Sequence, residues 1–202
     1  MRTFRTPLGL VSVAATARGL ARVVLPGPGG MATPCCCVAM CSERPHGHAK
    51  AKRDHATLAQ ATVNGSDPAA EAIAARAERE IREYLAGRRR PLDHVRGRPE
   101  WVEGRRFTVP LDLSGLSPFH RRVLQAARRI PYGRTATYSD LARRVGRPLA
   151  ARAVGQAMAR NPVPLVIPCH RVVASGGGLG GYGGGLDLKR RLLALEGARL
   201  TE

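Results

Sequence analysis

The segment from Asn161 to Val173 constrains the fold of this chain more than any other. It is largely apolar and contains prolines at positions 162, 164 and 168. Proline lacks a backbone N–H and pushes the residue before it towards extended conformations, so this segment cannot continue a helix. A thiol and an imidazole, those of Cys169 and His170, stand side by side near its end. We therefore expect an extended, buried segment that presents a cysteine–histidine pair.

Cys169 is a candidate nucleophile because a thiolate attacks readily and a nearby base can remove the thiol proton. An isolated cysteine beside a histidine is more often an inert part of the core, so its surroundings must decide. We expect the side chain of Asn161 to bind backbone near the pair. Glu196 lies in the last turn of a helix predicted over 186–197, where the helix dipole disfavours a carboxylate. This position predicts a specific partner, naturally His170, and a surface glutamate is the alternative.

The chain before this segment is predicted to be helical. Helices are expected over 117–130, 138–145 and 149–160, with a tight turn at Gly146 and Pro148 between the last two. Two short helices joined by such a turn are typical of a helix-turn-helix, whose second helix enters DNA.

The helix predicted over 149–160 carries one arginine among small residues. Its inward face is expected to hold Ala150, Ala153, Val154, Ala157 and Met158, and its outer face Arg152, Gly155, Gln156 and Ala159. Small residues let a helix approach a duplex closely, so the Arg152 guanidinium is placed to enter the base stack. An ordinary solvated arginine is the alternative.

Eight of the ten residues over 176–185 are glycine. We expect a backbone loop that closes over a flat ligand, with Tyr182 as one wall. A flexible linker is the alternative reading of the same composition.

The first half of the chain is less regular. Residues 1–26 are predicted to form a β-hairpin of two strands, and 68–86 a helix that ends before Gly87. A short strand is expected over 107–111, and the domain boundary lies near 112–115.

The formal net charge of +18 favours a polyanion such as nucleic acid, although a basic surface without such a partner is the alternative. No apolar run is long enough to span a membrane. Residues 1–40 are rich in arginine, as transit peptides are, but their pattern favours strands. Because arginines interrupt the apolar stretch, we expect no secretory signal, a cytoplasmic location and reduced thiols.

A second cluster of thiols precedes the predicted helix over 68–86. It comprises Cys35, Cys36, Cys37, Cys41, His46 and His48. The spacing lacks paired C-x-x-C units, so we expect no metal site and no cofactor, with a zinc site as the alternative.

Several motifs together resemble those of one known family. They are Pro131-Tyr132-Gly133, Thr137-Tyr138-Ser139, Ala151-Arg152-Ala153-Val154-Gly155, Asn161-Pro162-Val163-Pro164, Pro168-Cys169-His170-Arg171-Val172, the glycine-rich loop and Leu193-Ala194-Leu195-Glu196-Gly197. Over about residues 107–198 the chain is similar to the O6-alkylguanine-DNA alkyltransferases, also called methylated-DNA–protein-cysteine methyltransferases. The segments 27–66 and 88–106 have no counterpart in that family and are interpreted as insertions.

The resemblance implies an α+β fold with two domains. Residues 1–111 would form a small N-terminal ribonuclease-H-like αβ domain that includes both insertions. Residues 112–202 would form a C-terminal winged-helix domain, with the helix-turn-helix, that binds DNA and carries the catalytic residues.

The resemblance also implies catalytic roles. Cys169 would accept the alkyl group, and His170 and Glu196 would activate it through a bound water. Tyr138 would help to neutralise charge on the leaving guanine, and Asn161 would position the backbone of the site.

Contacts with the substrate follow from the same resemblance. Arg152 would fill the place that the extruded base leaves in the stack. Further DNA contacts are implied for Thr137, Ala151, Gly155 and Gln156, and a base pocket for Met158, Pro164, Val172, Tyr182, Gly183 and Gly184. Many members carry a base-binding serine at the position of Gly183, where a backbone N–H would act here.

The expected function is direct DNA repair. The chain would act as a monomer on double-stranded DNA and transfer an alkyl group from guanine O6, with O4 of thymine as a second candidate, to Cys169 in one turnover. A DNA-binding damage sensor or winged-helix transcription regulator without transfer is the alternative. A cysteine hydrolase is a third candidate, for which no separate oxyanion motif is found.

Overall fold

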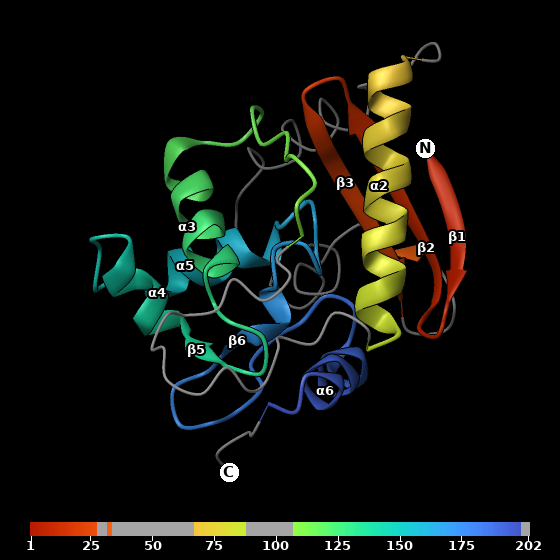
Figure 1. The fold of residues 1–202 in the computed structure, drawn as a ribbon. Helices are drawn as coiled ribbons and strands as arrows, with labels where there is room; N and C mark the ends of the chain where they lie inside the picture. Colours follow the sequence, from red (N-terminus) through yellow and green to blue (C-terminus); the bar gives the residue numbers. More distant parts are fainter. Residues whose placement is uncertain (28–31, 34–66, 88–106, 199–202) are drawn as a thin grey trace, which may run out of the picture.

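The chain of 202 residues has a mixed α/β fold (Figure 1). A computed structural model describes residues 1–27, 32–33, 67–87 and 107–198. A four-stranded antiparallel sheet contains β1 (Arg2–Thr6), β2 (Gly9–Thr16), β3 (Gly19–Pro26) and β4 (Ala32–Thr33) in that order. The helices are α2 (Pro68–Leu85), α3 (Pro118–Arg128), α4 (Tyr138–Arg144), α5 (Ala151–Ala159) and α6 (Leu186–Leu195).

The N-terminal region forms a three-stranded meander, so the predicted two-stranded hairpin is wrong. The omitted strand is β1, which pairs with β2 from Arg2–Val13 to Thr6–Gly9. Phe4 is its only buried residue, and it lies opposite Val11. A strand with one buried side chain gives a weak alternation, which is why the hydrophobic pattern did not reveal it.

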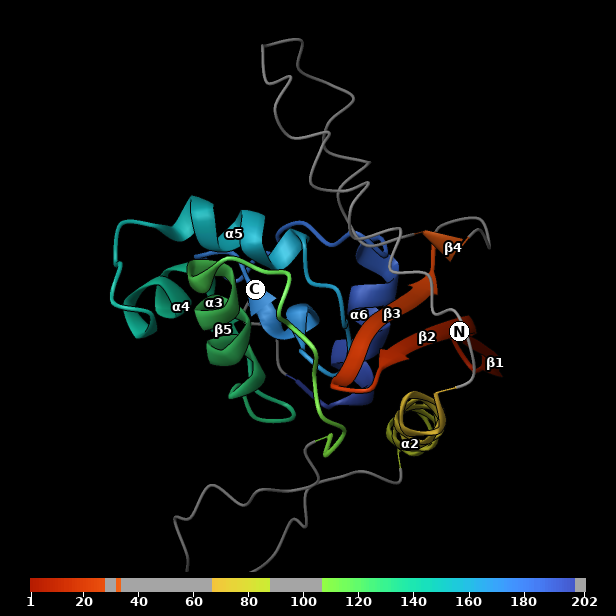
Figure 2. The same cartoon turned by 90° about the horizontal axis from the view of Figure 1, so that it is seen from above.

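Helix α2 packs across this sheet (Figure 2). Its start was predicted from Pro68, and Asp67 caps it by accepting a hydrogen bond from the Ala69 N–H. Gly87 follows the helix with a φ of 68°, a left-handed conformation suited to glycine. The predicted helix over 68–86 is therefore confirmed to within a residue.

No strand forms over 107–111, which corrects the prediction for this segment. Leu111 makes only an isolated parallel bridge with Leu20. Pro110 has no N–H to donate, and the N–H of Thr108 binds the carboxylate of Glu80 on α2. The segment is therefore anchored to the helix as well as to the sheet edge.

Helices α3 and α4 begin within one residue of the predicted positions. Ser117 caps α3, and Thr137 caps α4 in a reciprocal capping box with Asp140. Helix α5 begins at Ala151, two residues later than predicted, because the preceding residues turn and leave Leu149 100% exposed. Ala153 is exposed rather than inward-facing, which is a second correction on this helix.

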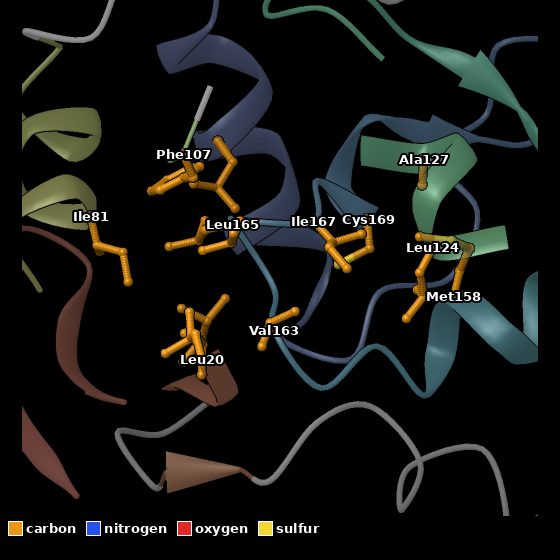
Figure 3. Packing of buried hydrophobic residues seen from close by; sticks show 14 of the residues in the cluster. Leu20, Ile81, Phe107, Leu124, Ala127, Met158, Val163, Leu165, Ile167 and Cys169 are labelled. Carbon is orange, nitrogen blue, oxygen red and sulfur yellow. The ribbon is translucent and has the colours of Figure 1, made fainter. Parts of the chain in front are cut away.

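Buried residues from both halves of the chain belong to one hydrophobic cluster among the described residues. Figure 3 shows Leu20 and Ile81 on one side, Leu124 and Met158 on the other, and the segment from Val163 to Cys169 between them. Helix α6 lies at the bottom of the view in Figure 1, near the C-terminal end of α2. No described helix is both long and apolar enough to cross a membrane. The segment that carries Cys169 is thus enclosed by elements from most of the chain.

Candidate active site

The loop leading to Cys169 is held by a buried asparagine. Asn161 Nδ2 donates to the carbonyl of Ile167 at 2.8 Å, and Asn161 Oδ1 accepts from the N–H of Val163 at 3.1 Å. Between them Leu165 has a φ of 70°, a left-handed conformation that costs a leucine about 1 kcal/mol. The structure therefore places Asn161 on the backbone of the site, where the sequence predicted it.

Cys169 begins a single 3₁₀ turn, Cys169–Arg171, and is 6% exposed. The strand β6 (Val172–Val173) follows and pairs in parallel with β5 (Ala136–Thr137), directly before α4. This pairing brings the start of α4 next to the cysteine turn. The thiol lies within the core cluster, beside Ile167 in Figure 3.

Glu196 is the C-cap of α6 and lies in a buried cluster of hydrogen-bond donors. Its Oε1 is 2.9 Å from His170 Nε2, and Arg171 Nε donates to Oε2 at 2.9 Å and Arg171 Nη2 to Oε1 at 2.8 Å. The backbone N–H of Gly133 also donates to Oε2 at 3.1 Å. Burial raises the pKa of this carboxyl, but the hydrogen bonds from His170 and Arg171 and the positive charge of Arg171 outweigh burial and hold the pKa at about 2. Glu196 is therefore ionised, and the surface alternative for it is excluded.

The contact with Glu196 fixes the protonation of His170. A carboxylate only accepts hydrogen bonds, so the proton of the neutral ring must sit on Nε2. Burial is the main cause that lowers the pKa of His170, against the opposing effect of Glu196. The other ring nitrogen, Nδ1, is buried and has no hydrogen-bond partner among the described residues. The imidazole is therefore a neutral base whose available lone pair is on Nδ1.

The sequence analysis missed three residues of this site. Tyr84 on α2 donates to Glu196 Oε1 at 2.6 Å, and its helical spacing indicated only a core residue. Arg171 is buried and also donates to the carbonyl of Ile130 at 2.6 Å. Its place directly after His170, in a segment otherwise apolar, was the available signal.

Lys189 on α6 is the third missed residue and is fully buried. Its Nζ donates to the carbonyl of Val172 at 2.6 Å and to that of Leu179. Burial lowers the pKa of this amine to about 8, and the nearby Cys169 opposes the shift. Lys189 thus connects β6, the strand after Cys169, to residues 176–185, which are called the glycine-rich loop below.

The glycine-rich loop packs against two tyrosines. A Cβ at Gly180 would lie 3.2 Å from the ring of Tyr138, and one at Gly184 would lie 3.1 Å from the ring of Tyr182. A Cβ on Gly155 of α5 would also contact Tyr138, at 3.9 Å. Tyr138 therefore lies between α5 and the loop.

The remaining predicted residues fall into two groups. On α5, Arg152 and Gln156 are exposed and Ala151 and Gly155 are half-buried, whereas Thr137 caps α4. Of the predicted pocket residues, Met158, Pro164 and Val172 are buried, and Tyr182, Gly183 and Gly184 are half-buried in the loop.

A surface hollow beside β5 and β6 is lined by Thr137, Asp140, Val173, Ala174 and Gly177 among others, and it contains none of these pocket residues. The residues Cys35, Cys36, Cys37, Cys41, His46 and His48 lie outside the described residues.

Comparison with known proteins identifies the same region. The family described as "6-O-methylguanine DNA methyltransferase, DNA binding domain" matches residues 118–198. A methylated-DNA–protein-cysteine methyltransferase of Mycolicibacterium paratuberculosis is 56% identical over 90 residues, which are 45% of this chain and 54% of that protein. The chain therefore spans about half the length of the first curated relatives that it matches.

Two other comparisons extend over more of the chain. A methylated-DNA–protein-cysteine methyltransferase of Methanosarcina acetivorans is 41% identical over 122 residues, which are 60% of this chain and 68% of that protein. The crystal structure of Mycobacterium tuberculosis OGT in complex with DNA superimposes with a TM-score of 0.63 and 29% identity. That match covers 97% of this chain and 91% of the other.

Proposed function

Because this chain belongs to the methylated-DNA–protein-cysteine methyltransferase family, we propose that it repairs DNA by moving an alkyl group from guanine O6 to Cys169. The neutral imidazole of His170 carries this proposal. Its Nε2 lies 2.9 Å from Glu196, and its buried Nδ1 has no hydrogen-bond partner among the described residues. The residue before it in the chain, Cys169, is also buried. An adjacent base is needed because a free thiol is only a few per cent ionised at neutral pH.

The reaction follows from these positions. A water molecule carries the proton of the Cys169 thiol to Nδ1 of His170. The thiolate then attacks the alkyl carbon, so that a C–S bond forms while the C–O6 bond breaks and its electron pair stays on the guanine. The guanine takes up one proton from the hydroxyl of Tyr138, the donor that we assign, and the proton held by the imidazolium restores the Tyr138 hydroxyl. The net proton transfer is from thiol to guanine.

The product limits each molecule to one reaction. A thioether, unlike a disulfide, is not reversed by thiol exchange. The protein is therefore consumed with its substrate, and no cofactor takes part in the transfer.

The lesion must leave the base stack before the thiol can reach it, at a cost of a few kcal/mol. We assign this step to α5, on which Arg152 and Gln156 are exposed and Gly155 is half-buried. Arg152 fills the vacated place, while Thr137 and Ala151 contact the backbone of the duplex. The extruded base lies against Met158, Pro164, Val172, Tyr182, Gly183 and Gly184.

The architecture that we propose has two domains. Residues 1–111, with β1 to β3 and α2, form a ribonuclease-H-like domain that contains the insertions at 27–66 and 88–106. Residues 112–202 form a winged-helix domain in which α4 and α5 are the helix-turn-helix. The net charge of +18 suits a duplex as partner. We propose that the protein acts as a monomer in the cytoplasm.

Mass spectrometry tests the transfer. Reduced protein incubated with a duplex containing O6-methylguanine should gain one methyl group, and peptide mapping should place it on Cys169. The Cys169→Ala variant retains the four other cysteines and should bind the duplex but gain no mass. Binding without any transfer by the wild-type protein would indicate a sensor or regulator, and repeated turnover would exclude the single-use mechanism. A duplex with O4-methylthymine tests the second lesion.

A pair of arginine variants tests the role of α5. Arg152→Ala should slow repair roughly tenfold or more, whereas affinity for undamaged duplex should fall by less than about threefold because many basic residues share it. Arg160→Ala, at the C-cap of the same helix, is the matched control for loss of one charge. Equal losses of rate and affinity in Arg152→Ala would contradict the base-replacing role.

A further inference from the structure

A hydroxyl from the N-terminal part of the chain lies inside the proposed catalytic cluster. Tyr84, in the last turn of α2, is 3% exposed. Its hydroxyl is 2.6 Å from Glu196 Oε1 and 3.3 Å from His170 Nε2. The three atoms are mutual neighbours, because His170 Nε2 is itself 2.9 Å from Glu196 Oε1. They come from α2, the 3₁₀ turn and the end of α6.

The direction of the hydrogen bonds in this triangle is determined by chemistry. Burial, and then the negative charge of Glu196, raise the pKa of Tyr84 well above its usual value, so the phenol keeps its proton. An ionised carboxylate cannot donate, so Tyr84 donates to Glu196. With its proton used there, the phenol oxygen can only accept from the ring nitrogen. Both neighbours of Nε2 are then acceptors, and Nε2 must carry the ring proton.

We propose that Tyr84 is a positioning residue of the thiol-activating relay, which holds Glu196 and the Nε2-protonated form of His170 from the N-terminal domain. This inference rests on the proposed function. It means that the N-terminal domain contributes to activation of Cys169, although that domain contains neither the nucleophile nor the base.

The charged groups around His170 determine the expected effect. Glu196 at the end of α6 favours the imidazolium, whereas Arg171 beside it and Lys189 on α6 disfavour it. Tyr84 and Arg171 both donate to Glu196 and draw charge away from its contact with His170. Without the Tyr84 hydroxyl, more of that negative charge acts on the imidazole ring, so the pKa of His170 rises. A smaller fraction of His170 is then in its neutral, basic form on the acid side of the profile.

The surrounding rings allow this hydroxyl to be removed cleanly. Tyr84 packs at 5.6 Å from Phe107 and at 6.1 Å from Tyr132, measured between ring centroids. A phenylalanine at position 84 keeps both contacts. Tyr132→Phe is the matched control, because its hydroxyl donates to the carbonyl of Leu195 at 2.9 Å rather than to the Glu196 carboxylate.

The experiment is a single-turnover rate of methyl transfer across a range of pH for the wild type, Tyr84→Phe and Tyr132→Phe, with duplex affinity measured alongside. For Tyr84→Phe the acid limb of the profile should move up by about one pH unit, so the rate on that limb falls about tenfold. On the high-pH plateau the loss should stay below about threefold, and affinity should be unchanged. Tyr132→Phe should keep the wild-type profile.

Two outcomes would overturn the inference: a profile of Tyr84→Phe that superimposes on that of the wild type, or a loss of rate in Tyr84→Phe that is the same at every pH. If the wild type transfers no alkyl group, the proposed function fails, and the ionisation of His170 is then measured directly by NMR with labelled histidine. A His170 pKa higher in Tyr84→Phe than in the wild type supports the inference, and an unchanged one overturns it. Should Tyr84→Phe not fold, NMR of the wild type decides. A Tyr84 hydroxyl proton bonded to the Glu196 carboxylate, together with a ring proton on Nε2, supports the inference. A ring proton on Nδ1, or a Tyr84 hydroxyl that does not donate to Glu196, refutes it.

Discussion

Two buried carboxylates in this protein have different kinds of hydrogen-bond partner. Glu80 on α2 is 2% exposed and accepts from the Thr108 N–H at 2.8 Å, from the Thr108 hydroxyl and from Arg76 Nε at 3.2 Å. Glu196 is 6% exposed and accepts from His170, Arg171 and Tyr84. Both carboxylates join segments that are far apart in the sequence.

The difference lies in what the partners can do. Neither an amide N–H nor a hydroxyl of threonine changes protonation near neutral pH, and arginine stays charged. An imidazole, in contrast, can take up and release a proton, and Nδ1 of His170 has no partner among the described residues. A buried carboxylate whose donors do not change protonation therefore indicates a structural role. A catalytic role is indicated only when one of the donors has a second atom that can take up a proton from a neighbouring nucleophile.

The largest contrast is expected in the transfer rate of Glu196→Gln. Glutamine keeps one acceptor oxygen but loses the negative charge, so it cannot accept from His170, Arg171 and Tyr84 together or support the imidazolium. Single-turnover methyl transfer should therefore slow roughly 10³-fold. Quench-flow or gel assays with a methylated duplex measure this rate. A loss below about tenfold would mean that Glu196 is an anchor like Glu80.

The dependence of stability on pH should distinguish the same carboxylate. The folded pKa of Glu196 is about 2 against an ordinary value of 4.5. The unfolded chain therefore binds the proton first as the pH falls. Roughly 3 kcal/mol of the free energy of unfolding is present above about pH 5 and is lost as the pH falls towards 2.

Urea unfolding of the wild type and Glu196→Gln at several pH values checks this loss. The stability advantage of the wild type should shrink as the solution is acidified. An advantage that stays constant from pH 6 to about 3 would show that the carboxyl is not held ionised by its neighbours.

Glu80→Gln should affect stability and spare the reaction. Removing a charged acceptor from the Thr108 N–H and hydroxyl should lower the free energy of unfolding by about 1–3 kcal/mol. The transfer rate of the folded fraction should stay within about twofold of the wild type, since general-base function is untouched. Denaturation and rate assays on one preparation give both quantities, and a tenfold slower transfer would remove the distinction between the two carboxylates.

The smallest effect is expected for Arg76→Ala. The side chain of Arg76 is 45% exposed, whereas that of its partner Glu80 is 3% exposed. Ion pairs with an exposed member contribute little, so the free energy of unfolding should fall by less than about 1 kcal/mol. Denaturant midpoints measure it, and a loss as large as that of Glu80→Gln would mean that the cation, rather than the Thr108 backbone, holds Glu80.

Sequence reasoning predicted the parts of the fold that local chemistry determines. The helices predicted from 68, 117 and 138 begin there to within one residue, because Asp67, Ser117 and Thr137 cap them through contacts that span a few residues. The pairing of His170 with Glu196 was also predicted, because a carboxylate at a helix C-terminus needs an explanation.

Features that depend on distant contacts were not predicted. Strand β1 buries only Phe4, and the segment around Thr108 gives its N–H to a glutamate 28 residues earlier. Tyr84 has the spacing of an ordinary core residue. Its hydroxyl bonds to Glu196 only because the fold brings the ends of α2 and α6 together. Hydrophobic periodicity in a single sequence predicts helices and strands, but it does not predict which distant residues come into contact.

The glycine-rich loop has a consequence for how freely its positions can be exchanged. A Cβ at Gly178 would meet only the Cβ of Ala174, at 3.9 Å, which is ordinary contact. At Gly180, where φ is 65°, a Cβ would press on the Tyr138 ring, and at Gly184 it would lie 2.7 Å from Leu188. Alanine substitution along this loop should therefore be tolerated at Gly178 and destabilising at Gly180 and Gly184. At the latter two positions the absence of a side chain lets the backbone pack directly against its neighbours.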